Sequence, residues 1–485
     1  MSESPAPILY RCGTLTYTKR HLLVLFFWLL WGDFCYMLME TVTPSIMPLK
    51  FKVLGASNME VGMILGTIPA IIYSVLNPII SFKSDRFRSR WGRRIPFIVF
   101  SLPFLVLCLI GLAFGDRMGF WIHARVDAGT ITPNSMAIWI IGVLMVAFIF
   151  FNTFVTSTFW YLFNDVVPDH LLARFMSWFR MISMLSTTLY NFCIFRFANT
   201  HSTEILIGAA LLYLIGFGLM CLNIKEGEYP PPPAYVDGAS GPLAAIKTYA
   251  KESLSIKHYW FQWLASFIGA VGGGVATFNL FFSMAIGLSL EQIGYINGST
   301  SLCVAVLVLG TGWLADRYHP LRVVIAGSVF GILLAIPATL IWLFWHPEPR
   351  VAFWVALAIS LGLTAPLQAS LAMADPPLLM RLFPRERYGQ FCSTNAIWRS
   401  LGGVIGGGLA GLFLDFVGRW VGKDRAYFFI PLWSLLFAIP NLVFLFKLYQ
   451  SWKKLGGDDA YIPPSLGDSE PLLDSVSAMP SSTKH

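Results

Sequence analysis

Long apolar segments separated by short polar ones make up most of the chain. No charged residue lies between Val61 and Phe82, and none lies between Ile95 and Gly115. A run of about 18 or more apolar residues is long enough to cross a bilayer as a helix. The pattern predicts an all-α polytopic membrane protein with twelve transmembrane helices, at about residues 21–48, 61–82, 95–115, 137–164, 172–196, 205–224, 259–285, 292–315, 323–345, 351–374, 388–415 and 426–447.

Two polar segments set the expected domain boundaries. Residues 225–257 contain four consecutive prolines, which cannot continue a helix. We therefore expect an N-terminal six-helix half over residues 1–224, a cytoplasmic linker over 225–257 and a C-terminal six-helix half over 258–450. Residues 451–485 are rich in Ser, Pro, Gly and Asp, and this composition predicts a disordered tail.

The two halves share landmarks that indicate an internal repeat. Asp85-Arg86 after the second span recurs as Asp316-Arg317 after the eighth, and Pro168 recurs with the same offset as Phe175, at Pro384 and Phe391. Repeated halves related by an axis along the membrane normal bind their substrate near the bilayer midplane, between the halves.

Charge fixes the expected orientation. The loop Ser84–Arg94, which we call the arginine loop, holds five arginines between two spans. Short loops rich in Lys and Arg stay in the cytoplasm. We therefore expect both termini to be cytoplasmic and the protein to lie in the cell membrane. The net charge of +8 reflects this asymmetry and does not indicate a nucleic-acid partner.

The arginine loop also carries a family resemblance. Residues 85–98 read Asp-Arg-x-x-Ser-Arg-x-Gly-Arg-Arg-x-Pro-Phe-Ile. This motif resembles that of the major facilitator superfamily, in its sucrose-transporter and glycoside–pentoside–hexuronide:cation symporter branch. The resemblance implies the major facilitator fold, and a loop aspartate near the inner end of span eleven. It implies a gating role for Asp85, Arg86, Gly92, Arg93, Arg94, Asp316 and Arg317.

Two acids in span one are candidates for proton coupling. Asp33 lies twelve residues into the span, or roughly 18 Å, which is near the middle of the bilayer core. Ionisable side chains at such depth are costly and are functional candidates by default. Glu40 lies nearly two turns further, on the same face, near the outer boundary. For Glu40, an ordinary interfacial carboxylate is an equally good interpretation.

Arginines in spans five and eleven complete the buried charges that we expect. A buried charge needs a partner, so Asp33 and Arg180 form either a structural pair or a switch that protonation of Asp33 opens. In the symporter branch, an acid on span one and an arginine on span five resemble this arrangement and take part in sugar binding. Span two lacks the paired aspartates of sodium-coupled members, so a proton is the expected coupling ion.

Polar and aromatic side chains within other spans are candidates for sugar contact, although each is individually consistent with packing. Together with Asp33, the predicted substrate-binding residues are Asn152, Trp160, Arg180, Asn279, Gln368, Asn395, Trp398 and Arg399.

The leading hypothesis is a secondary active transporter that carries a sugar or glycoside with a proton by alternating access. The alternatives are a facilitator or exporter of another small organic solute, and a transporter-like sensor that does not translocate. The His-Glu-x-x-His, Gly-x-Ser-x-Gly and Walker A motifs are absent from the sequence, so we do not expect an enzyme. We expect a monomer in the lipid bilayer, with no cofactor and no bound metal.

Overall fold

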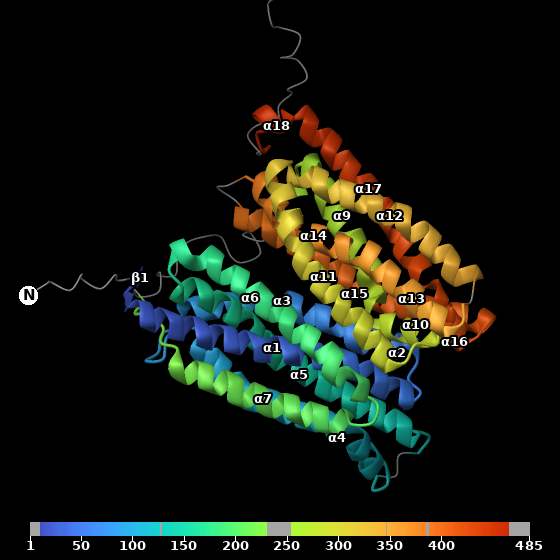
Figure 1. Ribbon diagram of the computed structural model, residues 1–485. Coiled ribbons are helices and arrows are strands. Elements are labelled where there is room, and N and C mark those ends of the chain that lie inside the picture. The colour runs from blue at the N-terminus through green and yellow to red at the C-terminus, as the bar shows by residue number, and fades with distance from the viewer. Residues whose placement is uncertain (1–9, 127–128, 230–253, 346, 385–387, 465–485) are drawn as a thin grey trace, which may run out of the picture.

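The computed structural model describes residues 10–126, 129–229, 254–345, 347–384 and 388–464, and the structural statements below concern these ranges (Figure 1). Most of these residues lie in helices. A helix satisfies its backbone N–H and C=O groups internally, which makes it a suitable element for crossing a bilayer that offers no water.

The N-terminal half begins with a small antiparallel hairpin of β1 (Tyr10–Cys12) and β2 (Leu15–Tyr17). Its six helical segments are α1 (Lys19–Val53); α2, η1 and α3 (Asn58–Gly62, Met63–Thr67 and Ile68–Arg86); α4 (Ile95–His123); α5 (Pro133–Val166); α6, η2 and η3 (Asp169–Leu189, Tyr190–Ile194 and Phe195–Phe197); and α7 (Ser202–Asn223).

The C-terminal half repeats this number of segments. They are α9, η4 and α10 (Lys257–Gly273, Gly274–Phe278 and Asn279–Ala285); α11 (Leu290–Arg317); α12 (Pro320–Phe344); α13, η5 and α14 (Pro349–Ile359, Ser360–Thr364 and Ala365–Leu382); α15 (Tyr388–Val421); and α16, η7 and α17 (Lys423–Ala426, Tyr427–Phe429 and Ile430–Lys454). The short helix α18 (Gly457–Ala460) follows.

The predicted all-α fold with two six-helix halves is confirmed. Within the described residues, ten helical segments are long and apolar enough to span a membrane. The more polar segments α6 and α11 complete the twelve. Because α6 and α11 contact each other across the two halves, part of their polar surface is directed away from lipid.

Span three is longer than the apolar pattern predicts. Helix α4 continues to His123 through Asp116, a charged position that we expected to lie in an outer loop. The buried ammonium of Lys50 explains the extension, because it donates to the carbonyls of Leu112 and Ala113 and lies 3.4 Å from the Asp116 carboxylate. A charged pair between α1 and α4 thus allows the helix to include an acid.

The prediction of a disordered tail from residue 451 is wrong for residues 451–464. Helix α17 continues to Lys454, and the chain beyond it packs on the C-terminal half. The Tyr461 hydroxyl donates to the carbonyl of Leu382, and the Tyr259 hydroxyl donates to the carbonyl of Pro464. Residues 465–485 lie outside the described ranges.

The two halves touch near one end of the molecule and diverge toward the other (Figure 1). We call the end with the arginine loop, β1 and α18 the loop end, and the opposite end the far end. The contacts between the halves join α2, η1 and the start of α3 to α15, and join α6, η2 and η3 to α11. Most of these contacting segments belong to the far-end parts of their spans, so the far end is closed.

Candidate functional site

The main contact between the halves is a hydrogen-bonded junction at the far end, which we call the far-end junction. Its members are Asn58, Met59, Gly62 and Thr67 of the N-terminal half and Val404, Gly407, Gly408, Gly411, Asp415 and Tyr427 of the C-terminal half.

One carboxylate of α15 holds the start of α2 at this junction. The Asp415 Oδ1 atom accepts from the backbone N–H of Asn58 at 3.2 Å and from its Nδ2 at 2.9 Å. Asp415 Oδ2 accepts from the backbone N–H of Met59 at 2.9 Å. These N–H groups belong to the first turn of a helix and have no partner within that helix, so an anion from the other half binds them well. The Tyr427 hydroxyl adds a bond to Asn58 Oδ1 at 2.7 Å.

Glycines bring the two backbones together at the junction. A Cβ atom on Gly411 would overlap the backbone oxygen of Asn58 and lie 2.9 Å from the Cα atom of Met59. A Cβ atom on Gly407 would lie 2.9 Å from the backbone oxygen of Gly62. Small residues of this kind allow close helix contact within a membrane.

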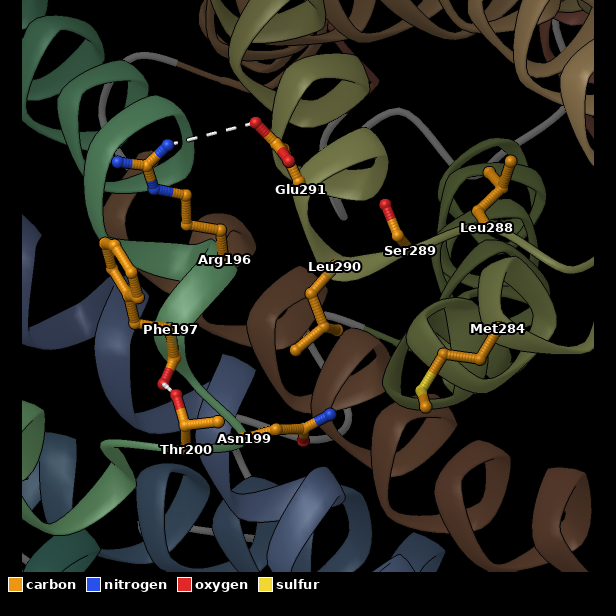
Figure 2. Close-up of a pocket in the computed structure, with 9 residues that line it drawn as sticks. All are labelled: Arg196, Phe197, Asn199, Thr200, Met284, Leu288, Ser289, Leu290 and Glu291. Atoms are coloured by element: carbon orange, nitrogen blue, oxygen red, sulfur yellow. Dashed lines mark hydrogen bonds and ion pairs between the residues drawn. The ribbon is translucent and has the colours of Figure 1, made fainter.

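The two halves also meet at a second place at the far end, where the α6–α7 turn and the α10–α11 turn line a surface pocket (Figure 2). Figure 2 shows Arg196 of the N-terminal half reaching toward Glu291 of the C-terminal half, with 3.9 Å between the charged groups. None of the residues that line this pocket is a predicted site residue, and it lies at the far end rather than at mid-span. We therefore regard the pocket as part of the closed far end and not as the substrate site.

Within the described residues, the arginine loop contacts the end of α5 and the first residues of the linker. Arg94 pairs with Asp85 at 2.5 Å, and Arg93 and Arg94 both pair with Asp165 at the end of α5. The Glu226 carboxylate accepts from the backbone N–H groups of Arg93, Arg94 and Ile95 at 2.7–2.9 Å, so it caps α4.

Aromatic and backbone contacts complete this arrangement. Burial raises the pKa of Tyr229, whose hydroxyl therefore stays protonated and donates to Glu226 at 2.9 Å. The Arg93 guanidinium lies over the Tyr229 ring, 4.2 Å from its centre. Gly92 has a φ of +102°, and a Cβ atom there would overlap the Glu226 carboxyl group, so two separate constraints favour glycine.

The other predicted gating residues lie at the loop ends of α3 and α11. Arg86 is half-buried at the end of α3, and Arg317 is exposed at the end of α11. The side chain of Asp316 lies outside the described part of the chain.

Asp33 is completely buried among the helices of the N-terminal half. Its Oδ2 atom accepts from the Ser183 hydroxyl on α6 at 2.8 Å, and within the described residues its Oδ1 atom has no hydrogen-bond partner. Arg180 is close enough to influence Asp33 electrostatically, but it forms no ion pair with Asp33 within 4 Å among the described residues. The tight structural pair that we considered is therefore not formed in this conformation.

Glu40 belongs to a separate polar group. The Asn152 amide donates to Glu40 Oε1 at 2.6 Å, and Tyr73 lies beside both. One turn away on α3, Asn77 accepts from Ser157 at 2.5 Å. The structure thus brings Glu40 and Asn152 together, with α1, α3 and α5 all contributing side chains.

The remaining predicted contacts fall in different environments. Trp160 packs edge-on against Phe163 and Phe179 in the aromatic core. In the C-terminal half, Asn395 is buried and accepts from Ser266, whereas Trp398 packs edge-on against Trp260. Asn279 and Gln368 are exposed, and the structure does not bring them into contact with Asp33.

Sequence analysis missed Asp375, because the predicted span at residues 351–374 ends one residue before it. Asp375 lies on α14, seven residues from the loop-end terminus of that helix. Its Oδ2 atom lies 3.8 Å from Nη1 of Arg399 on α15. An acid inside an apolar segment is itself a signal for function, and helix α14, which continues through Pro376 and Pro377 to Leu382, includes Asp375.

The geometry is that of a two-half bundle, closed at the far end, with separate charged or polar groups at mid-span in each half. The sequence profile of a family described as MFS/sugar transport protein matches residues 29–448, which is most of the chain.

Solved structures of transporters share the fold. One is a bacterial homologue of the human lysosomal transporter Spinster in an inward-facing, unoccupied conformation, with a TM-score of 0.64, 14% identity, and coverage of 90% of this chain and 99% of that chain. The nucleoside transporter NupG has a TM-score of 0.56, 14% identity and coverage of 88% and 99%. A D-xylose-proton symporter has a TM-score of 0.57, 11% identity and coverage of 87% and 96%.

Proposed function

The chain belongs to the MFS/sugar transport protein family, and we propose that it is a secondary active transporter that carries a sugar or glycoside together with a proton. We further propose that the transporter is a monomer in the cell membrane and that its loop end is cytoplasmic. The conformation closed at the far end is then the inward-facing state. The similarity of the fold to an inward-facing transporter supports this assignment.

A single observation carries the proposal of proton coupling, namely the environment of Asp33. A carboxylate within a membrane span is costly when it is ionised and unpaired. Asp33 is fully buried, and its one hydrogen-bond donor among the described residues is the neutral Ser183 hydroxyl. Such a group can gain or lose its proton when a conformational change alters its surroundings.

Arg180 provides the means of coupling protonation to the substrate. It lies on the same helix as Ser183, is exposed, and is near Asp33 without forming an ion pair. With Asp33 protonated, Arg180 is free to donate hydrogen bonds to a sugar hydroxyl. With Asp33 ionised and the substrate released, Arg180 can move to neutralise it. A buried charge that must find a partner in this way links the two binding events.

The test uses purified protein in proteoliposomes with radiolabelled glucose, xylose, sucrose and maltose, with and without an imposed pH gradient. We expect uphill accumulation of at least one sugar only with the gradient. Asp33→Asn should abolish this accumulation and retain exchange of the sugar down its own gradient, because Asn imitates the protonated acid.

The matched control is Ser183→Ala, which removes the hydrogen bond but keeps the carboxylate. It should change the rate of accumulation without removing its dependence on the gradient. Undiminished accumulation by Asp33→Asn would exclude Asp33 from coupling, and uptake independent of the gradient in the unmodified protein would indicate a facilitator.

Orientation is tested separately with single cysteines and an impermeant thiol reagent in intact cells. A cysteine at Ser135, near the far-end start of α5, should be labelled. One at Ser89 in the arginine loop should be protected, and the reverse result would overturn the proposed topology.

A further inference from the structure

The C-terminal half contains an ion pair, Asp375–Arg399, within two helices that we assign to the membrane. The side chains are 39% and 69% exposed, and 3.8 Å separates the charged atoms. Both helices belong to apolar segments long enough to span the bilayer. Because a charge that faces lipid is costly, exposed charged groups at this level must face water.

The helical phase of α15 shows which way Arg399 faces. Exposed apolar side chains at Ile397, Leu401 and Ile405 mark the lipid-facing side of this helix. Arg399 lies two positions from both Ile397 and Leu401, which places it on the opposite side. One turn toward the far end, a Cβ atom on Gly403 would lie 3.5 Å from the Ala70 side chain of the N-terminal half, whereas one on Gly402 would meet Phe267 and Ala270 of α9. Arg399 therefore lies on the side of α15 away from lipid, between the face that packs on α9 and the face that approaches the other half, just on the loop-end side of the point where the halves touch.

Arg180 lies at a comparable level in the N-terminal half. One turn toward the far end from Arg180, Met184 packs against a cluster of the C-terminal half that Val304, Ala365 and Ala369 form. Arg180 lies on the same side of α6 as Met184, toward the C-terminal half, and it is nevertheless exposed. Each half thus presents one exposed arginine beside the level at which the two halves separate.

We propose that Asp375 and Arg399 form the C-terminal wall of the substrate site, opposite Asp33 and Arg180, and that both bind sugar hydroxyls. A hydroxyl group both donates and accepts, so neighbouring hydroxyls of a sugar can donate to the Asp375 carboxylate and accept from the Arg399 guanidinium. The separation of 3.8 Å leaves the two groups only loosely paired, so both remain available to a ligand. This assignment rests on the proposed sugar transport.

A purely structural role fits the geometry less well. A solvated ion pair with this separation contributes little to folding, whereas a charge placed inside an apolar segment is costly. Substrate sites between repeated halves need residues from both of them, and Asp375 and Arg399 are the pair that the described C-terminal half offers at this level.

The main test measures counterflow of radiolabelled glucose, xylose, sucrose and maltose at equal pH on both sides, which removes proton coupling from the readout. Asp375→Asn and Arg399→Gln should each raise the half-saturation constant at least tenfold for the sugar that the unmodified protein carries. The matched charge controls are Arg381→Gln, on the exposed end of α14, and Asp424→Asn, on the exposed α16, and both should stay within twofold.

Exchanging the two charges separates binding from structure. In a protein with both Asp375→Arg and Arg399→Asp, a structural pair would restore the unmodified half-saturation constant, and this result would overturn the proposal. If the Asp375–Arg399 pair acted only as a gate, the variants would change the rate of counterflow and leave the half-saturation constant unchanged. That result would also overturn the proposal. If the unmodified protein exchanges none of the sugars, the proposed function itself fails and this proposal fails with it.

A measurement on the unmodified protein covers the case in which a variant does not fold. Cys392 lies on the same face of α15 as Arg399, two turns nearer the loop end, and it is close enough to Asp375 to interact with it electrostatically. Saturating sugar should slow alkylation of Cys392 by N-ethylmaleimide at least threefold, measured by mass spectrometry. The exposed Cys193, nearer the far end, serves as the internal control. Equal protection, or none, at the two cysteines would contradict the proposal.

Discussion

Two carboxylates, one at each end of the molecule, bind the start of a helix in the same way. Glu226 accepts from three backbone N–H groups at the start of α4, and Asp415 accepts from two at the start of α2. Glu226 lies at the start of the linker, three residues after α7, and binds α4 of the N-terminal half, so it stays with that half. Asp415 and α2 belong to different halves.

The difference shows how one interaction serves either a fold or a conformational state. An anion at a helix start is favoured by the exposed N–H groups and by the helix dipole. When both partners move as one body, this free energy is present in every state and stabilises the fold. When the partners belong to bodies that separate, it is present only while they touch, so it stabilises one state against another.

The same logic applies to Asp85. The family resemblance implied that this aspartate lies near the inner end of span eleven. In the structure it pairs with Arg94 of its own half and is half exposed. The two halves diverge at the loop end, so any contact of Asp85 with span eleven requires a different, loop-end-closed conformation.

The strongest way to break the far-end junction is a substitution at its tightest point. Gly411→Ala would place a Cβ atom against the backbone of Asn58, which cannot move without separating the helices. Overpacking of this kind costs about 3 kcal/mol, so we expect a shift of more than about a hundredfold toward states with the far end open. Spin labels at Asn199 and Arg350 should move apart, and sugar uptake should nearly cease.

The control for this change is Gly403→Ala on the same helix. A Cβ atom there would meet Ala70 at 3.5 Å, an ordinary van der Waals contact. Both substitutions raise helix propensity equally, so only the contact with the other half differs. Similar label distances in the two variants would mean that the junction does not determine the conformational balance.

Removal of the carboxylate that crosses the junction should have the next largest effect. Asp415→Ala loses the hydrogen bonds to Asn58 and Met59 without adding a clash. Hydrogen bonds to a charged group contribute about 2 kcal/mol, which corresponds to a shift of roughly thirtyfold toward the far-end-open state. The same spin-label pair checks this shift. A change in melting temperature with an unchanged distance distribution would contradict the assigned role.

The helical segments and the arginine loop could be predicted from the sequence because they depend on local patterns. Apolar runs predicted the twelve spans to within about eight residues. Span three ends later than predicted because Lys50 neutralises Asp116 from another helix, and span ten also continues past its predicted end, through Asp375 to Leu382. The motif around Gly92 identified the loop between spans two and three, in which Gly92 has a positive φ, and its gating role stays a prediction.

The partners of the polar residues could not be predicted, because they depend on how helices rotate about their axes. The sequence does not indicate the roles of Asp415 and Glu226, since acids near the ends of spans are common and nothing nearby in the sequence identifies their partners. Asn152, which is predicted to bind sugar, donates to Glu40, a partner that its position in the sequence does not indicate. Each such contact joins residues more than a hundred positions apart, and no local spacing encodes it.

Loss of the cap within one half should lower stability without shifting the conformational balance. Glu226→Ala leaves three N–H groups at the start of α4 without this acceptor, and the loss of a helix cap costs about 1–2 kcal/mol. We expect a lower melting temperature in detergent and an unchanged distance between labels at Asn199 and Arg350. A shift in that distance would show that the loop end and the far end are coupled, and the comparison of the two carboxylates would fail.

The smallest effect is expected at the other crossing point of the far end, Arg196–Glu291. Its groups lie 3.9 Å apart and are each about half exposed, at 48% and 53%. Exposed pairs contribute about 0–1 kcal/mol because water screens them and their side chains lose freedom on pairing. Arg196→Gln should therefore shift the label distances by much less than Asp415→Ala does, and the remaining effect should vanish in about 1 M salt, where the Debye length is about 3 Å. An effect as large as that of Asp415→Ala, or one that persists in high salt, would show that this pair and not the carboxylate at the start of α2 holds the far end closed.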